Sequence, residues 1–304
     1  MKTYTSDTIF SIEELPSSLT IVGGGIIGVE FATIFSSLDI PVTIVELGDR
    51  LIPTEDAEAA QIVEEKLKNS GVKIFTNVSV SSVSHHSDKD DIQFTLSDHT
   101  EFSTGSLLLA TGRTPDTRVV EDVSIEKENG FIKTNNKLET SLPNVYAIGD
   151  VNGKIQLAHT ASAEGLIAAN NASGEPLKTI DYRMVPKCVY TLPEISSVGL
   201  TEEEARNTYS NIKVQKVLYS SNGKALSSGN TEGFVKTIAE EQFGEILGVT
   251  MVGSHVTEMI GESVAFMNLE GTVEELAETI HPHPTLSEAM FEAANEWLNK
   301  GIHH

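Results

Sequence analysis

The chain has 304 residues, 39% of them hydrophobic, and a formal charge of −23 at pH 7. This length and apolar content are typical of two or three compact units with sizeable cores. The charge argues against a nucleic-acid partner, because phosphate groups would be repelled, and favours solubility or a basic protein partner. No apolar stretch is long enough to span a bilayer and residues 1–7 lack the core of a signal peptide, so we expect no membrane attachment and a cytoplasmic location.

A glycine-rich turn separates the first apolar run, Leu19–Val22, from a segment with apolar residues at helical spacing. Its glycines, Gly23, Gly25 and Gly28, form a G-x-G-x-x-G pattern. The first allows a tight turn, the second lets a pyrophosphate approach the backbone, and the third permits close packing of the helix on the strand. The N-terminus of that helix would stabilise the anion. The pattern predicts a dinucleotide site in a Rossmann-like α/β domain.

An acidic residue ends the next apolar run. Glu46 follows the strand predicted over Val42–Val45 and lies about 20 residues beyond the glycines. A carboxylate there can accept hydrogen bonds from the adenosine ribose and would repel a 2′-phosphate, which favours NAD(H) over NADP(H). Arg50 is close enough in sequence to leave a mixed preference open. The alternative is that Glu46 only ends a buried strand in solvent.

The chain then alternates between helix and strand. A helix is predicted over Thr54–Asn69, stopped at Gly71, and a strand over Val72–Phe75 continues a parallel sheet. We therefore expect a doubly wound domain, with helices on both faces of the sheet. Two antiparallel strands and a polar turn with solvated histidines should follow; the strands span Val78–Val83 and Ile92–Leu96, and the turn contains His85, His86, Asp88 and Asp91.

Two further strand ends are candidate ligand contacts. The strand over Leu107–Ala110 leads to a turn at Gly112, at the edge where open α/β sheets bind ligands, although it could be an ordinary strand end. The apolar run before Gly149 predicts a strand with Asp150 at its tip, followed by a helix over Ala158–Asn171. Asp150 could accept from a sugar or ribityl hydroxyl, or it could cap this region. Both interpretations of Asp150 stay open.

The residues from Val185 onward predict an α+β unit. The single cysteine, Cys188, lies in a predicted strand, where a packed small side chain is the simplest interpretation, and it has no partner for an internal disulfide. A helix capped at Thr201 and strands around Phe234 and Ile246 follow.

The last segment of interest is His281-Pro-His-Pro-Thr-Leu-Ser-Glu288. Thr285 is the predicted N-cap of a helix that runs through Trp297. Glu288 could simply complete a capping box with Thr285, which the local pattern favours, or it could orient the imidazole of His283 for acid–base work. His281 and His283 supply only half of a tetrahedral metal site, so we expect no metal.

These motifs together resemble one enzyme family. They are Gly23-Gly-Gly-Ile-Ile-Gly28, Ala110-Thr-Gly-Arg113, Tyr146-Ala-Ile-Gly-Asp150, Tyr190-Thr-Leu-Pro-Glu-Ile-Ser-Ser-Val-Gly199, Thr257-Glu-Met-Ile-Gly-Glu262 and the segment from His281 to Glu288. Over nearly its whole length the chain is similar to the carboxyl-terminal two-thirds of the class I pyridine nucleotide-disulfide oxidoreductases, most closely the dihydrolipoamide dehydrogenases. The resemblance implies a flavoprotein oxidoreductase of cell redox homeostasis that uses FAD and NAD.

The resemblance also assigns roles to residues. It makes His283 the acid–base that deprotonates a dithiol and Glu288 the residue that orients it. Glu30 would lie near the contact of nicotinamide and flavin, Gly112 beside the dinucleotide, and Asp150 would hold the ribityl chain of FAD. The implied organisation is a leader (1–17), an NAD-binding domain (18–115), a partial FAD-binding central segment (116–180) and a dimerisation domain (181–304).

The resemblance implies partners as well. We expect a homodimer, in which the histidine serves the flavin of the opposite subunit, and an acidic surface that suits a basic segment of a 2-oxoacid dehydrogenase acyltransferase. The family's amino-terminal flavin domain and redox cysteine pair have no counterpart in these residues, so FAD binding is in doubt and the isolated chain is expected to be inactive in lipoamide oxidation. The alternatives are a standalone NAD-binding and dimerisation module without redox activity, or a related disulfide reductase.

Overall fold

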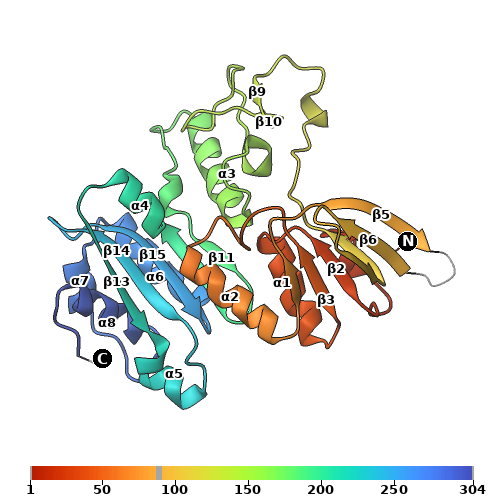
Figure 1. Ribbon diagram of the computed structural model, residues 1–304. Coiled ribbons are helices and arrows are strands. Elements are labelled where there is room, and N and C mark those ends of the chain that lie inside the picture. The colour runs from red at the N-terminus through yellow and green to blue at the C-terminus, as the bar shows by residue number, and fades with distance from the viewer. Residues whose placement is uncertain (1, 87–90, 303–304) are drawn as a thin grey trace. The chain divides into compact units, whose positions relative to one another are not determined.

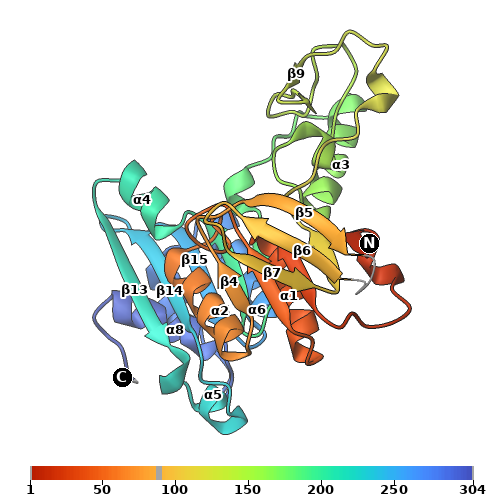
Figure 2. The same cartoon turned by 45° about the vertical axis from the view of Figure 1, so that its right-hand side comes forward.

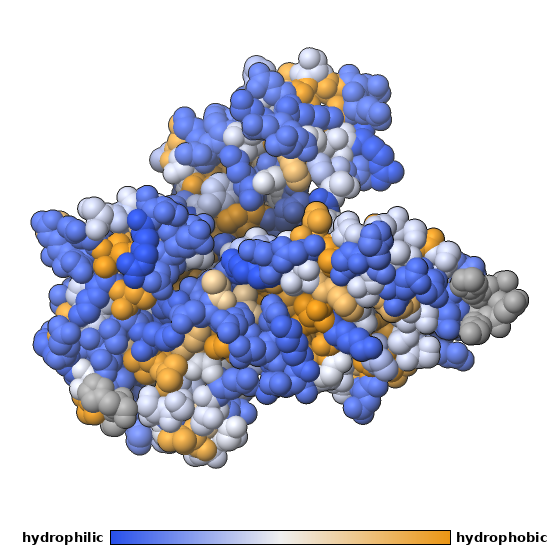
Figure 3. Space-filling view, viewed as in Figure 1, coloured by the Kyte–Doolittle hydropathy of each residue, from blue (hydrophilic) through white to orange (hydrophobic). Residues whose placement is uncertain are grey.

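The computed structural model describes residues 2–86 and 91–302, which form two compact units. Arg113–Val185 make up the second unit, and the remaining described residues make up the first. Figure 1 shows their elements along the chain. No helix within the described ranges is long and apolar enough to cross a membrane. The face drawn in Figure 3 is mostly hydrophilic, with apolar residues in separate patches.

A five-stranded parallel sheet carries the glycine-rich turn. Its order is β1-β8-β2-β3-β4, and the strands span Thr3–Thr5 (β1), Ser106–Leu109 (β8), Leu19–Val22 (β2), Val42–Val45 (β3) and Lys73–Phe75 (β4). The four strands predicted from apolar runs are confirmed to within one residue at each end. The pairing of β1 with β8 was not predicted, because three polar or aromatic residues give no apolar run.

The two faces of this sheet are covered differently. Helices α1 (Ile26–Ser37) and α2 (Ala57–Asn69) share one core with Leu108 of β8. The neighbouring Leu107 points to the opposite face, because successive strand side chains alternate, and there it packs with Ile92 and Phe94. Those residues belong to an antiparallel sheet of β5 (Val80–His86), β6 (Asp91–Leu96) and β7 (Glu101–Thr104), a layer of its own in Figure 2.

The Rossmann-like α/β class is confirmed, whereas the expectation of helices on both faces was wrong. The alternating apolar residues of β6 supply a flat apolar surface that takes the place of a second helical layer. His85 and His86 are also not turn residues, since they end β5 and pair with Ile92 and Asp91. The predicted turn residue Asp88 lies outside the described residues.

The last 120 or so residues of the first unit form an antiparallel sheet with helices. Its order is β11-β12-β15-β14-β13, over Lys187–Val189 (β11), Glu194–Gly199 (β12), Ile246–Gly253 (β15), Phe234–Glu240 (β14) and Ile212–Leu218 (β13). Its helices are α4 (Glu202–Thr208), α5 (Gly223–Ser228), α6 (Val256–Asn268), α7 (Val273–Glu278) and α8 (Glu288–Trp297). Helix α6 packs on β12 and β15, and α8 packs on β13 and β14. The predicted α+β unit is confirmed.

The parallel and antiparallel halves of the first unit share one hydrophobic core. Phe234 and Val252 of the antiparallel sheet belong to the same buried cluster as Val63 and Leu67 of α2. Helix α2 also contacts β15 directly. The nucleotide-type half and the half with the histidine segment are therefore held in a fixed relation by apolar packing.

The second unit is built around α3 (Ala158–Ala172), close to the predicted helix. It also contains the hairpin of β9 (Lys127–Glu128) and β10 (Phe131–Ile132). Its described 3-10 helices are η2 (Arg118–Val120), η3 (Gly149–Asn152) and η4 (Tyr182–Met184). The 3-10 helices η1 (Ile9–Ser11) and η5 (Tyr219–Ser221) belong to the first unit. The predicted strand before Gly149 was wrong. That run finds a single bridge, between Glu139 and Tyr146, and Asp150 lies in η3. An apolar run needs a partner strand to form a ladder.

Candidate functional site

The three glycines of the turn between β2 and α1 meet different surroundings. Gly23 has φ +112°, and a Cβ on it would collide with the carbonyl oxygen of Ala110 in the neighbouring chain segment after β8. A Cβ on Gly28 would collide with the carbonyl oxygen of Gly23. A Cβ on Gly25, in contrast, would meet nothing within 4 Å. The protein's own packing thus requires glycine at the first and third positions, whereas the second position has open space where a side chain would lie.

The helix that follows offers an anion site at the same place. Helix α1 begins at Ile26, and its N-cap, Gly25, has no side chain to accept from the first turn. The first N–H groups of a helix have no acceptor within the helix, and they lie at the positive end of its dipole. The open side of Gly25 and this helix end together suit a phosphate-sized anion.

Glu46 is fixed beside the turn. Its Oε2 accepts from Gly24 N–H at 2.5 Å, and its Oε1 accepts from Gly48 N–H at 2.6 Å. The residue is half-buried and doubly hydrogen-bonded, so it does more than end a strand in solvent. A carboxylate has about four lone-pair positions, and two of them remain to accept from hydroxyl groups.

Arg50 is engaged elsewhere. Its guanidinium donates to three backbone carbonyls, those of Ile52, Pro53 and Glu55, at 2.9 to 3.1 Å. An arginine that recognises a 2′-phosphate needs its planar fork of donors free for that anion. This placement removes the main sequence argument for a mixed cofactor preference.

Gly112 and Glu30 complete the residues predicted at this edge. Gly112 has φ +112° and open space where a Cβ would lie, just beyond β8 and beside the glycine turn. Glu30 lies on α1, and its Oε1 accepts from Tyr190 N–H at 2.9 Å, which ties the helix to the end of β11. Burial raises the pKa of Glu30, and the bond from Tyr190 opposes that shift.

The histidine segment brings a second set of predicted residues together. The Nδ1 of His283 lies 2.9 Å from Oε1 of Glu288, while Oε2 of Glu288 accepts from Thr285 N–H at 2.7 Å. The imidazole of His283 is 77% exposed and the side chain of Glu288 is 25% exposed. The two interpretations of Glu288 are therefore compatible in geometry, because one carboxylate contacts the imidazole of His283 and also accepts from the backbone of Thr285.

The start of helix α8 differs from the prediction. The helix begins at Glu288 with Ser287 as N-cap, and the hydroxyl of Thr285 donates to the carbonyl of Pro282 instead of capping the helix. The loop between α7 and α8 is thus two residues longer than predicted. It keeps His283 in the loop and outside the helix.

His281 lies in a different environment, which sequence reasoning did not foresee. Its ring is only 6% exposed, with Nε2 2.7 Å from Oε1 of Glu262 and Nδ1 3.0 Å from the carbonyl oxygen of Thr279. Each histidine of the motif therefore has its own carboxylate. Within residues 2–86 and 91–302, no group of three His, Cys, Asp or Glu side chains has the arrangement of a metal site.

Asp150 lies in the second unit, on the exposed side of η3. The turn that presents it is held by Glu164, which is fully buried. Glu164 accepts from Gly149 N–H at 2.5 Å, from the amide of Asn152 at 3.0 Å and from the hydroxyl of Tyr182 at 2.6 Å. Burial and this carboxylate raise the pKa of Tyr182. Sequence reasoning missed Glu164, because a single acidic residue within a helix carries no sign of burial.

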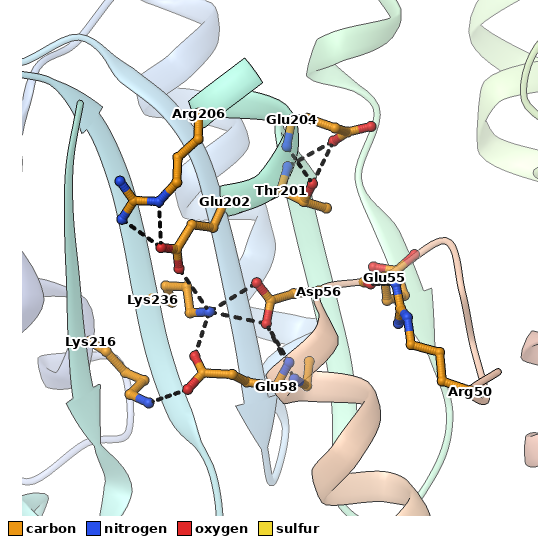
Figure 4. A network of polar contacts seen from close by, with 11 residues as sticks. Arg50, Glu55, Asp56, Glu58, Thr201, Glu202, Glu204, Arg206, Lys216 and Lys236 are labelled. Carbon is orange, nitrogen blue, oxygen red and sulfur yellow. Dashed lines mark hydrogen bonds and ion pairs between the residues drawn. The ribbon is translucent and has the colours of Figure 1, made fainter. Parts of the chain in front are cut away.

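A separate polar network joins the two halves of the first unit (Figure 4). Lys236 of β14 is 3% exposed, and its ammonium lies 2.9 Å from Asp56, 2.5 Å from Glu58 and 3.4 Å from Glu202. Glu58 also pairs with Lys216, and Glu202 pairs with Arg206; the six residues make three cations and three anions. The network includes none of the predicted site residues.

Comparison with known proteins places these features in a family. Residues 1–165 match the family described as pyridine nucleotide-disulphide oxidoreductase, and residues 185–294 match the dimerisation domain of that family. A dihydrolipoyl dehydrogenase of Bacillus subtilis is 42% identical over 304 residues, with 98% of this chain and 64% of that protein covered. One from Halobacterium salinarum is 39% identical, with 96% and 63% covered.

Solved structures give the same result. LpdA from Mycobacterium tuberculosis matches with a TM-score of 0.91 at 30% identity, over 96% of this chain and 64% of that one. The HOCl-induced flavoprotein disulfide reductase RclA from Escherichia coli, as its Cu(II) complex, matches with a TM-score of 0.89 at 31% identity, over 97% and 67%. The chain thus spans less than two-thirds of the length of the dihydrolipoyl dehydrogenases that it matches.

Proposed function

The chain belongs to the pyridine nucleotide-disulphide oxidoreductase family, and we propose that it contributes an NAD site and an acid–base pair to dihydrolipoyl dehydrogenase chemistry. In that reaction protein-bound dihydrolipoamide is oxidised with NAD⁺ through FAD and a redox disulfide. The family resemblance inferred from the motifs is confirmed. The observation that carries the proposal is the bond from His283 to Glu288 at 2.9 Å, on an imidazole that is 77% exposed.

The nucleotide half of the proposal rests on the glycine turn. Its residues fit a dinucleotide, because the open side of Gly25 and the uncapped start of α1 suit a pyrophosphate, while Glu46 retains acceptors for ribose hydroxyls. Bound NAD⁺ would supply a hydride acceptor. Gly112 and Glu30 are proposed to lie beside the dinucleotide, and the engagement of Arg50 with backbone carbonyls favours NAD(H) over NADP(H).

The acid–base half follows from the tautomer of His283. An imidazole that donates Nδ1–H to the Glu288 carboxylate has Nε2 as its proton acceptor. Nε2 can take the proton of a substrate thiol, and the carboxylate then stabilises the imidazolium that forms. Oxidation of a dithiol releases two electrons and two protons, whereas NAD⁺ takes up two electrons and one proton. His283 is proposed to carry the proton that is left over.

The 304 residues contain one G-x-G-x-x-G pattern and one cysteine, Cys188, so they offer no second dinucleotide cradle and no intrachain redox disulfide. Asp150 is exposed and could accept from the ribityl chain of FAD. We propose that this polypeptide taken alone does not oxidise dihydrolipoamide.

We propose that the chain is organised as a leader (1–17), whose strand β1 joins the parallel sheet, an NAD-binding domain (18–115), a central segment of FAD type (116–180) and a dimerisation domain (181–304). The match of residues 185–294 to a dimerisation domain supports a homodimer. The formal charge of −23 supports docking of a basic segment of a 2-oxoacid dehydrogenase acyltransferase.

The acid–base assignment is tested on the ¹⁵N-histidine-labelled chain by NMR. His283 should be mainly the Nδ1–H tautomer in the neutral form, and Glu288→Gln should shift it towards the Nε2–H form that free imidazole side chains prefer. The signal is assigned with His283→Gln. A wild-type His283 that is mainly Nε2–H would refute the base assignment.

The enzymatic assignment is tested by the absorption spectrum and the dihydrolipoamide–NAD⁺ turnover of the chain with added FAD. We expect neither a bound-flavin spectrum nor turnover. Turnover that is lost in His283→Gln would show that the polypeptide is active alone and would refute the inactivity proposal. NADH binding without turnover and without a bound flavin would leave the NAD-binding and dimerisation module as its function when isolated.

A further inference from the structure

The loop that carries His283 contains a second histidine with a contrasting environment. His281 is 6% exposed, and its ring lies 6.0 Å from that of Phe291 on α8. Nδ1–H donates to the carbonyl oxygen of Thr279, and Nε2 faces Glu262 of α6 at 2.7 Å. Two residues later the imidazole of His283 is 77% exposed. One end of this short segment is thus buried and anchored, and the other reaches solvent.

Both ring nitrogens of His281 are engaged. A backbone carbonyl can only accept, so Nδ1 carries a proton, and a second proton lies between Nε2 and the Glu262 carboxylate. The hydrogen bond that the His281 ring donates to the Glu262 carboxylate is the largest influence on this ring, and it raises the pKa of His281. A ring with a partner on each nitrogen has no free acceptor for a substrate proton. His281 is therefore suited to hold the loop, whereas His283 is suited to exchange protons.

The loop is tied at two further points. The carbonyl oxygen of Thr285 accepts from the side chain of Asn222 at 3.1 Å, and Thr285 N–H donates to Glu288. Glu288 projects from the first turn of α8, whereas Glu262 projects from α6. The segment that carries His283 is therefore held at one side by Glu262 on α6, through His281, and at the other by Glu288 on α8. The distance between His283 and Glu288 depends on both of these contacts.

We propose that Glu262 and His281 are a positioning pair, which holds the loop so that Nδ1–H of His283 stays bonded to Glu288 and its Nε2 remains the proton acceptor. The inference rests on the proposed role of His283 as the base. A side chain that is mostly exposed keeps one rotamer and one tautomer only when its backbone is fixed. The buried pair supplies that constraint without contacting the substrate.

The test uses the tautomer of His283 in the labelled 304-residue chain, which requires neither FAD nor turnover. In Glu262→Leu the ratio of Nδ1–H to Nε2–H forms of His283 should fall by about tenfold, the size expected for the loss of one hydrogen bond. Glu262→Gln should rescue the ratio, because its amide can donate to a neutral Nε2 of His281. The matched control is Glu275→Gln, which alters an exposed carboxylate at the start of α7.

A folding check accompanies each variant. The one tryptophan, Trp297, lies on α8 and donates to the carbonyl of Lys213, so its fluorescence reports the packing of this helix. If Glu262→Leu does not fold, His281→Gln removes the same pair from the other side. An unchanged tautomer ratio of His283 in either folded variant would overturn the proposal.

The outcome separates this inference from the proposed function. If wild-type His283 is mainly Nε2–H, the base assignment and the positioning pair are both refuted. If Glu288→Gln lowers the Nδ1–H fraction but Glu262→Leu and His281→Gln do not, the base assignment stands and the positioning pair is refuted. A loss in Glu262→Leu that Glu262→Gln restores, with Glu275→Gln unchanged, supports the pair.

Discussion

Replacing Lys236 by methionine should lower the free energy of unfolding by about 3 kcal/mol, because it leaves a buried carboxylate without its cation. Lys236 is 3% exposed and Asp56 is 4% exposed. Burial lowers the pKa of Lys236, but its bonds to Glu58 and Asp56 outweigh that effect, so the side chain is charged in the fold. Met keeps the length and apolar stem of lysine and removes only the ammonium.

The magnitude follows from what remains around each anion. Glu58 is 48% exposed and keeps Lys216, and Glu202 keeps Arg206, so both can be solvated or paired. Within the described part of the chain Asp56 has no second cation as a partner, although its Oδ1 accepts from two N–H groups at the start of α2. Those bonds and the helix dipole offset part of its charge, which places the loss near the lower end of the usual range of about 3–5 kcal/mol.

A second substitution tests whether the unpaired charge of Asp56 causes the loss of stability. Asn at position 56 still caps a helix but carries no charge, so Asp56→Asn added to Lys236→Met should recover stability. The matched control is Lys66→Met, which breaks an exposed pair with Glu232 at a similar distance and should cost about 0–1 kcal/mol. Urea unfolding followed by Trp297 fluorescence measures all four proteins. A double variant less stable than Lys236→Met would refute the reasoning.

Three further changes test other parts of the account. Burial raises the pKa of Glu55 above its ordinary 4.5, although the hydrogen bond from Ser197 opposes that shift. Protonated Glu55 therefore favours folding, and this contribution to stability is lost as the pH rises through the pKa of the folded state. Urea unfolding should show Glu55→Gln gaining stability relative to wild type between about pH 5 and pH 8. Glu46→Gln should weaken NADH binding about tenfold by loss of charge-assisted bonds, seen by calorimetry, with unchanged affinity counting against its role. Gly28→Ala should lower the thermal unfolding temperature by several degrees, about 1–3 kcal/mol, because its Cβ meets the carbonyl oxygen of Gly23; an unshifted transition would contradict the packing argument.

Sequence patterns predicted the nucleotide half of the fold well, because its signals are local. The glycines, the apolar run over Val42–Val45 and the acid Glu46 lie within one β-α-β unit, and backbone sterics fix each position. The pairing of His283 with Glu288 could also be predicted from the sequence, since the two residues are only five positions apart. The cap was misplaced because Thr285 has a suitable side chain but turns it towards Pro282.

Contacts between distant segments were not predictable in the same way. Lys236 pairs with Asp56, which lies 180 residues away in sequence. His281, in the loop before α8, contacts Glu262 of helix α6. The apolar run before Gly149 has strand-like composition but lacks a strand to pair with among the described residues, so it forms an isolated bridge and a 3-10 turn. A charge or an apolar run shows only what a segment can do, and the tertiary partner decides which possibility is realised.

The proposed NAD site is tested most directly by titrating the 304-residue chain with NADH while following nicotinamide fluorescence. We expect saturable binding that Gly25→Val abolishes, because valine fills the open side of the turn. Gly223→Val is the matched control, since a Cβ there also meets nothing within 4 Å but lies at the start of α5. NADPH should bind more weakly than NADH. Absence of NADH binding by the folded chain, or equal binding by Gly25→Val, would contradict the account.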